Sequence, residues 1–571
     1  MKRLVAIFLL SPLFCSAQSN QTLISNTNVV DVATGKVIRE ASVLFKDGII
    51  QDVFTNKKYK LAPNTTVIDG TGKYVMPGMT DAHIHFFQTG GLYTRPDGYD
   101  FNHIKPYKIE REDAFDSAGD FLRRYLKAGI TTVADVGGPF SNFIIRDSTS
   151  KKVLSPTVLV TGPLFSMVAD KPLDNGDAPI VKTTTIAAAD SLMDQLLARN
   201  PDYIKIWYIV TANLPADKTF PVVQHIAKRT HDAKLKLAVH ATQHKTAELA
   251  VDAGADILVH SVDDEVISDQ LLKKLVANKV SYNPTFIVHR GDDGVLLGDF
   301  KPDANDVNNA NPFFYGTLMD PEHIPEKDLP KVFSTVRSSR DAFVKRGRKQ
   351  DSIMRINLKK VYDAGVNVVA GTDAGNPGTM HASSFVRELE AMKTAGLTNA
   401  NLLKTATMNS ASCFGTNTGL VARGKIADII ILDKNPLDDI SVLTAPEYVI
   451  KSGKVLKTDT LVIESPEMLV QRQLNAYNAR NIDAFLDTYS DDIELYSFPD
   501  ALMSKGKDAM RTRYGEMFNR LKRLHCKIVD RIVLNNTVID HEYVNMDDKV
   551  VQAIAIYEVR DGKIIKVTFK R

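Results

Sequence analysis

The sequence predicts an α/β protein built on a TIM-type (β/α)8 barrel, with a small composite β-sandwich domain beside the barrel and an α+β domain after it. Three observations predict this architecture. The chain has 571 residues, more than one ordinary domain uses. Short β-rich runs alternate with longer helical stretches between residues 76 and 421, as in a parallel sheet. From about residue 466 the pattern changes to two helices followed by several strands.

The first residues have the layout of a secretory signal peptide. Lys2 and Arg3 precede an apolar run, and Cys15-Ser16-Ala17 forms a small-x-small cleavage site. We therefore expect residues 1–17 to be removed and the protein to be exported to the periplasm or the extracellular space. A buried N-terminal strand and a lipoprotein anchored at Cys15 are the alternatives.

Composition excludes several classes of function. Lys plus Arg total 71 and Asp plus Glu total 68, so the net charge of +3 gives no reason to expect nucleic acid or an anionic membrane as a partner. No later stretch is long and apolar enough to span a membrane. Signal cleavage would leave two cysteines, too few for a disulfide framework. A small-molecule substrate is the expected partner.

The flanks of the barrel read as short strands separated by turns. Residues 18–75 contain turn signals at Asp31–Gly35 and Lys46–Gly48, and residues 422–462 contain strand-like runs again. We expect the two flanks to join in one small β-sandwich.

Residues 76–421 are expected to form the barrel. Helical stretches end in "Ala-Gly" breaks, which are helix stops. The long connection from Thr285 to Val366 is expected to form a lid over the barrel mouth. The eight predicted strands end near Asp81, Asp135, Gly162, Trp207, His240, His260, Thr285 and Asp373.

The strongest local signal for chemistry is Asp81-Ala82-His83-Ile84-His85. Residues i and i+2 of a strand point to the same side, so His83 and His85 can reach one metal ion. The pair follows Met76-Pro77-Gly78 and an apolar strand, which favours a metal site over two histidines on a solvated loop.

The other candidate ligands also belong to predicted barrel strands, and barrel enzymes carry their chemistry at strand ends. His240, His260 and Asp373 each end an apolar run, whereas Lys205 lies inside one. A buried amine is costly, and reaction with carbon dioxide would convert Lys205 into an anionic carbamate ligand. The alternatives are an ion-paired lysine, satisfied core histidines and a helix N-cap for Asp373.

These six side chains can hold two divalent metal ions. Two such ions lower the pKa of a bridging water and polarise a carbonyl. Asp373 is expected to ligate one ion and to act as the catalytic base, then as the acid toward the leaving nitrogen.

At this point the chain resembles the amidohydrolase superfamily. The resemblance lies in residues 75–85, in Lys205, His240 and His260, in Gly371-Thr372-Asp373-Ala374-Gly375 and in the segment 424–437. It is most similar to the imidazolonepropionase-like and Xaa-Pro-dipeptidase-like branch. The resemblance implies two ions, usually zinc, bridged by hydroxide and by carboxylated Lys205. It also offers His381 either as a substrate contact or as a contact of a residue that touches the substrate, against a surface helix position. Tyr208 beside Trp207 is a candidate substrate-binding residue of the pocket wall.

The segment 466–571 resembles the SnoaL-like, nuclear-transport-factor-2 (NTF2)-like fold, a cone-shaped α+β domain. The likeness lies in residues 473–485 and 489–492. Steroid isomerases with this fold use a Tyr and an Asp, where this chain has Gln473 and about Ser497, so isomerase chemistry is not expected. A dimerisation or ligand-binding role is expected instead, with a second activity left open.

The sequence therefore predicts hydrolysis of a C–N bond through a metal-bridging hydroxide, in an N-acyl amino acid, a dipeptide or a cyclic amide. One alternative keeps the site but changes the bond to that of a lactone or a phosphotriester. The other is a periplasmic binding or assembly protein with a structural metal site.

Overall fold

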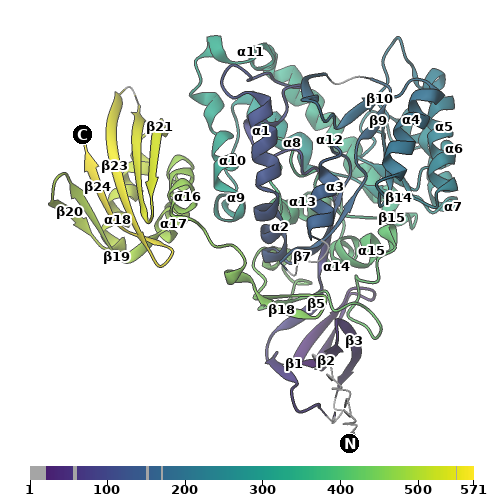
Figure 1. Ribbon diagram of the computed structural model, residues 1–571, viewed down its shortest axis with the longest axis horizontal. Coiled ribbons are helices and arrows are strands. Elements are labelled where there is room, and N and C mark those ends of the chain that lie inside the picture. Colours follow the sequence, from purple (N-terminus) through teal and green to yellow (C-terminus); the bar gives the residue numbers. More distant parts are fainter. Residues whose placement is uncertain (1–20, 56–58, 60, 150–153, 169–170, 548) are drawn as a thin grey trace, which may run out of the picture.

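The computed structural model describes residues 21–55, 59, 61–149, 154–168, 171–547 and 549–571. A small β domain lies below a large barrel, and a β-rich C-terminal domain lies at the side (Figure 1). The predicted signal peptide falls outside the described residues. Within them, no helix has the length and apolar character needed to cross a bilayer.

The small domain is one hydrogen-bonded sheet in the order β18-β17-β16-β5-β1-β2-β3, with β4 paired to β1. β16 from behind the barrel pairs antiparallel with β5 from in front of it, so both flanks build one domain, as predicted. Its core contains Ile24, Val43 and Ile429. The strands are β1 (Gln21–Asp31), β2 (Lys36–Lys46), β3 (Ile49–Thr55), β4 (Thr66–Asp69), β5 (Tyr74–Pro77), β16 (Ile429–Leu432), β17 (Tyr448–Lys451) and β18 (Lys454–Lys457).

Eight parallel strands form the barrel, and this confirms the predicted fold class. β8 meets β11 through the Asp202 amide, which donates to the Val160 carbonyl at 3.0 Å. The last strand returns to the first because the Ala82 amide donates to the Ala370 carbonyl at 2.9 Å. The barrel strands are β6 (Met79–Ile84), β7 (Ile130–Asp135), β8 (Thr157–Val160), β11 (Ile204–Trp207), β12 (Leu237–His240), β13 (Ile257–Val259), β14 (Ser281–Asn283) and β15 (Asn367–Val368).

Helices cover the outside of the barrel (Figure 1). The "Ala-Gly" breaks stop helices as predicted: Gly129, Gly254 and Gly365 have φ of 74°, 102° and 83°, a region that side chains disfavour. Two short strands, β9 (Leu164–Ser166) and β10 (Ile180–Lys182), extend the sheet beside β11. The helices are α1 (Tyr107–Asp116), α2 (Ala118–Lys127), α3 (Asn142–Thr149), α4 (Ile186–Leu197), α5 (Ala216–Asp232), α6 (His244–Ala253), α7 (Asp269–Ala277), α13 (Phe385–Lys393), α14 (Asn399–Lys404) and α15 (Ser410–Phe414).

The long connection after β14 is a chain of helices rather than an open loop. Val288 and His289, in the first turn of its first helix α8, line the barrel cavity, so the segment covers part of the mouth. Its helices are α8 (Ile287–Leu297), α9 (Ala304–Asn309), α10 (Pro312–Thr317), α11 (Lys331–Ser338) and α12 (Arg340–Asp363).

The C-terminal domain has a six-stranded sheet in the order β20-β19-β24-β23-β22-β21. The prediction located two of its helices and four of its strands, and missed β19, β20 and α18. The elements are α16 (Pro466–Asn478), α17 (Ile482–Asp487), β19 (Tyr489–Ser497), β20 (Ala501–Lys505), α18 (Lys507–Arg520), β21 (Leu524–Leu534), β22 (Thr537–Met546), β23 (Lys549–Arg560) and β24 (Lys563–Lys570).

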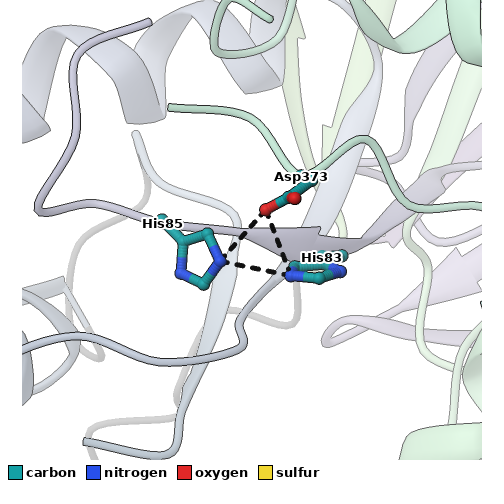
Figure 2. Close-up of side chains that lie close together, drawn as sticks. All are labelled: His83, His85 and Asp373. Atoms are coloured by element: carbon teal, nitrogen blue, oxygen red, sulfur yellow. Dashed lines mark hydrogen bonds and ion pairs between the residues drawn. The ribbon is translucent and has the colours of Figure 1, made fainter. Parts of the chain in front are cut away.

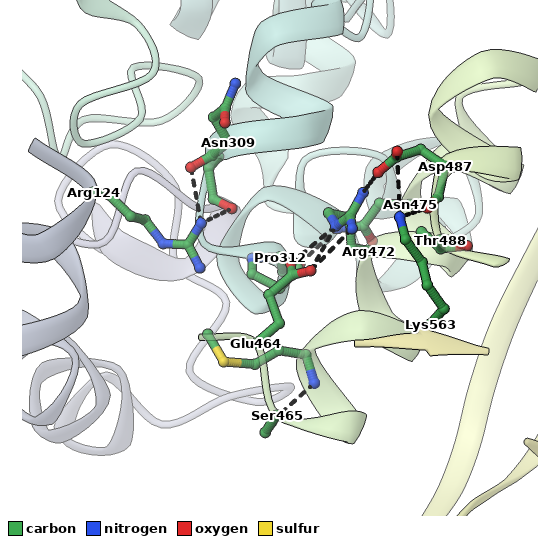
Figure 3. A network of polar contacts seen from close by, with 12 residues as sticks. Arg124, Asn309, Pro312, Glu464, Ser465, Arg472, Asn475, Asp487, Thr488 and Lys563 are labelled. Atoms are coloured by element: carbon green, nitrogen blue, oxygen red, sulfur yellow. Dashed lines mark hydrogen bonds and ion pairs between the residues drawn. The ribbon is translucent and has the colours of Figure 1, made fainter. Parts of the chain in front are cut away.

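This domain docks on the barrel through α16 and α10 (Figure 3). The buried Asn475 amide donates to the Pro312 carbonyl at 2.7 Å. A methyl group on Gly316 would lie 2.6 Å from the Asn475 side-chain oxygen, so the two helices approach closely because Gly316 has no side chain. Arg472 pairs with Glu464 in the linker and with Asp487, which fixes the entry of the chain into the domain.

Candidate active site

The carboxyl ends of the barrel strands carry a cluster of polar side chains. Strand alternation in β6 puts His83 and His85 on the same side. The buried Asp81 carboxylate, two residues before His83, accepts hydrogen bonds from the Thr372 amide at 3.0 Å and from the Thr372 hydroxyl at 2.7 Å. The Asp373 amide donates to the His83 carbonyl at 2.8 Å. These bonds hold Asp373 against the two histidines.

Three donor atoms meet at one point (Figure 2). The Asp373 Oδ1 lies 3.2 Å from the His83 Nε2 and 3.0 Å from the His85 Nε2, and the two Nε2 atoms lie 3.2 Å apart. Among the described residues, this trio is the group whose ligand atoms are close enough together to hold one metal ion.

Two of the three facing atoms, the His85 Nε2 and the Asp373 Oδ1, present unshared electron pairs to each other. The His85 Nδ1 donates to the Gly137 carbonyl at 2.7 Å, so in the neutral ring its Nε2 is unprotonated and faces the cluster. Burial holds the pKa of His83 well below its usual value. Burial alone would raise the pKa of Asp373, but its combined interactions with His83, His85 and His260 hold that pKa well below its usual value.

These residues fit a divalent cation. The Asp373 Oδ1 is buried and, among the described residues, has no hydrogen-bond partner, although two imidazole nitrogens lie about 3 Å away. A buried carboxylate oxygen without a partner is costly. One cation coordinated by the carboxylate and both imidazoles would remove that cost, and neutral imidazole and carboxylate are zinc-type ligands.

The other three predicted ligands line the same cavity. The His260 Nδ1 lies 3.9 Å from the Asp373 Oδ2, and the His260 ring centre lies 4.4 Å from that of His240. Lys205 projects into the cavity from β11, and burial lowers the pKa of its amine to about 7. Five of the six predicted side chains therefore line one cavity, and the sixth, His83, is fully buried against two of them, Asp373 and His85. Three of the six, His83, His85 and Asp373, are in ligand geometry.

The cavity has a volume of about 280 Å³ and apolar walls that include Phe87, Leu164 and Trp207. Two nitrogen-rich side chains that sequence reasoning missed, Arg95 and His289, also line it. The Arg95 guanidinium donates to Asp97 and Asn376. Arg95 and His289 lie in the segments that follow strands β6 and β14, and no local sequence pattern identifies either as a cavity residue.

Neither His381 nor Tyr208 lies on the cavity wall, although His381 contacts Gln88, which does. The two ring nitrogens of His381 contact the Tyr125 hydroxyl at 3.1 Å and the Gln88 carbonyl at 2.9 Å, and its ring stacks on Phe121. The buried Tyr208 hydroxyl donates to the Ala216 carbonyl at 2.9 Å. Both serve packing, because their polar atoms already have partners inside the protein.

The class of protein now follows from fold and site. A parallel barrel with a polar, carboxylate-containing cavity at the carboxyl ends of its strands is a barrel enzyme. The chain belongs to the Amidohydrolase family, whose profile matches residues 74–456, and residues 470–567 match the SnoaL-like domain. The protein is a hydrolase that acts on carbon–nitrogen bonds.

Three relatives illustrate the match. A 5-methylthioadenosine/S-adenosylhomocysteine deaminase of Pyrococcus furiosus is 22% identical over 79% of this chain and 96% of its own. Ochratoxinase of Aspergillus niger is 38% identical over 74% of this chain and 84% of its own. A Xaa-Pro dipeptidase with bound methionine has a TM-score of 0.59 at 22% identity, covering 77% of this chain and all of that one.

Ochratoxinase also has a solved structure, which superposes on this chain with a TM-score of 0.56 but only 17% identity. The sequence comparison gives 38% identity to ochratoxinase and the structural comparison gives 17%. The family assignment therefore rests on the profile match over residues 74–456. The alternative interpretations of the sequence, a lactone or phosphotriester substrate and a binding protein, have no support among these relatives.

Proposed function

We propose that this protein is a metal-dependent amidohydrolase that cleaves the amide or peptide bond of a small molecule. The observation that carries the proposal is the convergence of His83, His85 and Asp373 within 3.2 Å of one another. The proposed substrates are an N-acyl amino acid, a dipeptide or a cyclic amide. His289 supports the first two, since it lines the cavity and its N–H group could donate to a substrate carboxylate.

Two divalent ions, with zinc as first choice, are proposed as cofactors. His83, His85 and Asp373 would hold one, and His240 and His260 the other. Lys205 would join them after carboxylation, in which the neutral amine adds to carbon dioxide and loses a proton. A lysine pKa of about 7 supports this step, because much of the amine is then neutral near pH 7. Such ions lower the pKa of water and polarise a carbonyl.

The chain's own residues supply the proton transfers. Asp373 takes the proton of the attacking water and delivers it to the leaving nitrogen. Its low pKa keeps the carboxylate ionised before the water attacks. The Gly137 carbonyl fixes the tautomer of His85, and the apolar walls keep bulk water away from the reacting bond.

The test combines metal analysis with two matched variants. Wild-type enzyme should contain about two zinc-type ions per chain and hydrolyse members of a panel of N-acyl amino acids and dipeptides. Asp373→Asn should lower kcat by at least about 100-fold while keeping bound metal, since loss of a general base costs that much. His103→Asn, at an exposed histidine, is the control and should leave kcat unchanged. Metal-loaded wild-type enzyme that is inert on the whole panel would refute the proposal.

We also propose export of the protein and self-association through the C-terminal domain. The charged, apolar and small-residue segments of residues 1–17 support export. Exposed apolar side chains on the edge strand β21, among them Ile532 and Leu534, support self-association. Sequencing the N-terminus of the exported protein tests the first, and light scattering of Leu534→Asp against wild type tests the second.

A further inference from the structure

A large cavity lies between the C-terminal domain and the helical segment that covers part of the barrel mouth. Its volume is about 600 Å³, a size typical of small-molecule sites. It shares no lining residue with the barrel cavity or with the interior of the C-terminal domain. Residues within 295–302 and 318–325 line one side, and residues within 478–480, 522–525 and 545–547 line the other. Both domains therefore build this interdomain cavity.

One wall of the interdomain cavity is apolar. Val295, Phe300 and Leu318 line it on the side of the helical segment, and Leu524 lines it on the side of the C-terminal domain. Contact with such side chains removes hydrocarbon from water, which favours a ligand with an apolar part. The wall alone would accept any hydrocarbon, so the polar groups of the cavity decide the class of ligand.

Two histidines, one from each domain, line the same cavity. His323 and His525 stack face to face, with ring centres 3.6 Å apart and an angle of 12° between the ring planes. His525 is 3% exposed, yet its ring nitrogens have no hydrogen-bond partner among the described residues. Buried polar side chains in folded proteins almost always have such a partner. The His525 ring therefore has a donor available for a ligand in this cavity.

Two cations on the side of the C-terminal domain have no carboxylate partner among the described residues. The half-buried Arg480 guanidinium donates to the backbone carbonyls of Leu521 and Lys522, both at 2.7 Å. The Lys522 amine is exposed and forms no ion pair within the same part of the chain. Asn478 bonds to Cys526 of β21, which holds the end of α16 beside the buried histidine. These contacts bring two positive charges to the wall that the histidine lines.

The electrostatics of the interdomain cavity favour an anion. Burial, together with the positive charges of His323 and Lys527, lowers the pKa of His525 to about 3. Its ring is therefore neutral near pH 7 and has one N–H to donate. Asp547, one of two carboxylates at the cavity, already accepts from two backbone amides at 2.8 and 2.9 Å. The other, Glu322, is exposed, where water and salt screen its charge. The other charged side chains that line the cavity are positive.

We propose that the interdomain cavity binds a small organic anion, a monocarboxylate with an apolar chain. The chain would lie against Val295, Phe300 and Leu318. The carboxylate would accept hydrogen bonds from His525 and Arg480. An uncharged ligand would leave the arginine without a counter-charge, and the arginine would repel an amine. The inference concerns the junction of the two domains and does not depend on the substrate of the barrel.

Calorimetric titration of the full-length protein with octanoate tests the proposal. 1-Octanol is the analogue without the charge, and acetate is the analogue without the chain. Octanoate should bind the wild type with at least one site per chain. Each analogue should bind this site at least about ten-fold more weakly, because it lacks either the charge-assisted hydrogen bonds or the apolar contact.

Two variants and a control locate the site. His525→Phe keeps a ring in the stack but removes the N–H, so octanoate should bind at least about ten-fold more weakly. Lys522→Gln changes an exposed side chain, which should leave folding intact, and should weaken binding about three-fold. Arg520→Gln removes a nearby exposed charge that does not line the cavity, and it should bind octanoate like the wild type.

Three results would overturn the proposal. One is a wild type that does not bind octanoate. Another is equal affinity of the wild type for octanoate and 1-octanol, a comparison that needs no variant. The third is octanoate binding that is unchanged in folded His525→Phe or in Lys522→Gln, because the carboxylate would then bind elsewhere, including at the barrel site.

Discussion

At the scale of single residues, the site depends on a close approach between the first barrel strand and the segment after the last one. Asp81 and Thr372 bond across this junction, and Gly371 lies directly against it. A methyl group on Gly371 would lie 2.5 Å from the Asn283 side chain and 2.8 Å from the His83 amide nitrogen. Position 371 therefore requires glycine, because a side chain there would overlap Asn283 and the backbone of His83.

Gly371→Ala should displace the strand that carries His83 and His85. We expect a loss of about 1–3 kcal/mol in the free energy of unfolding, as for other overpacked sites. Metal content should fall with it, because the donor atoms would no longer meet. Denaturant unfolding and elemental analysis measure the two effects. Gly365→Ala is the control with no atom near the new methyl group, and it should lower stability through its φ of 83° without changing metal content.

At the scale of secondary-structure elements, one buried carboxylate joins α13 to the start of α8. Glu388 is fully buried and accepts hydrogen bonds from the amides of Phe286 and Ile287, both at 2.9 Å. Such amides at a helix start have no partner within the helix. The contact positions the turn that brings Val288 and His289 to the cavity.

Glu388 should make stability depend on pH. Burial raises the pKa of its carboxyl to about 8 in the folded protein, against a reference value of 4.5 in the unfolded chain. The folded state therefore binds the extra proton, so its contribution is complete below pH 4.5 and is lost as the pH rises toward 8.

Between pH 4.5 and pH 8 the contribution of Glu388 to the free energy of unfolding falls by roughly 1.4 kcal/mol per pH unit. Denaturant unfolding of wild type and Glu388→Gln at pH 5, 6.5 and 8 measures it. The stability of the wild type relative to Glu388→Gln should fall steadily across this range. Parallel curves for the two proteins would contradict the assignment.

At the scale of the whole molecule, the C-terminal domain supports the segment that leads into the active site. Asn475 bonds to Pro312 at the start of α10, and the Thr317 hydroxyl at its end accepts from the Leu92 amide at 2.9 Å. Leu92 begins the short turn η1 (Leu92–Thr94), which precedes Arg95 of the cavity wall. Docking is thus connected to the cavity through one helix and one turn.

Asn475→Ala should weaken this docking. It leaves the Pro312 carbonyl without its partner, at a cost of about 1–3 kcal/mol. We expect faster proteolysis of the linker near Glu464 and a raised KM at the barrel, since Arg95 loses its support. Asn478→Ala is the matched control on the same helix. Its bonds go to Cys526 within the domain, so it should lower domain stability without changing KM. Equal effects of both variants on KM would contradict the connection.

The sequence by itself determined the barrel, the composite β domain and the positions of the six clustered side chains. These follow from local rules: period two places His83 and His85 on one side of a strand, and parallel strands bring their carboxyl ends to one edge. The helix stops at Gly129, Gly254 and Gly365 were equally predictable, because a positive φ is a property of the residue and its neighbours.

Only the tertiary structure decided which side chains face the cavities. His381 and Tyr208 lie near the site in sequence, yet their polar atoms are used by Tyr125 and Ala216. Arg95 and His289 carry no sequence signal, and packing alone turns each toward the barrel cavity. The physical reason is that burial and hydrogen-bond pairing depend on segments far apart in the chain, which no local periodicity records.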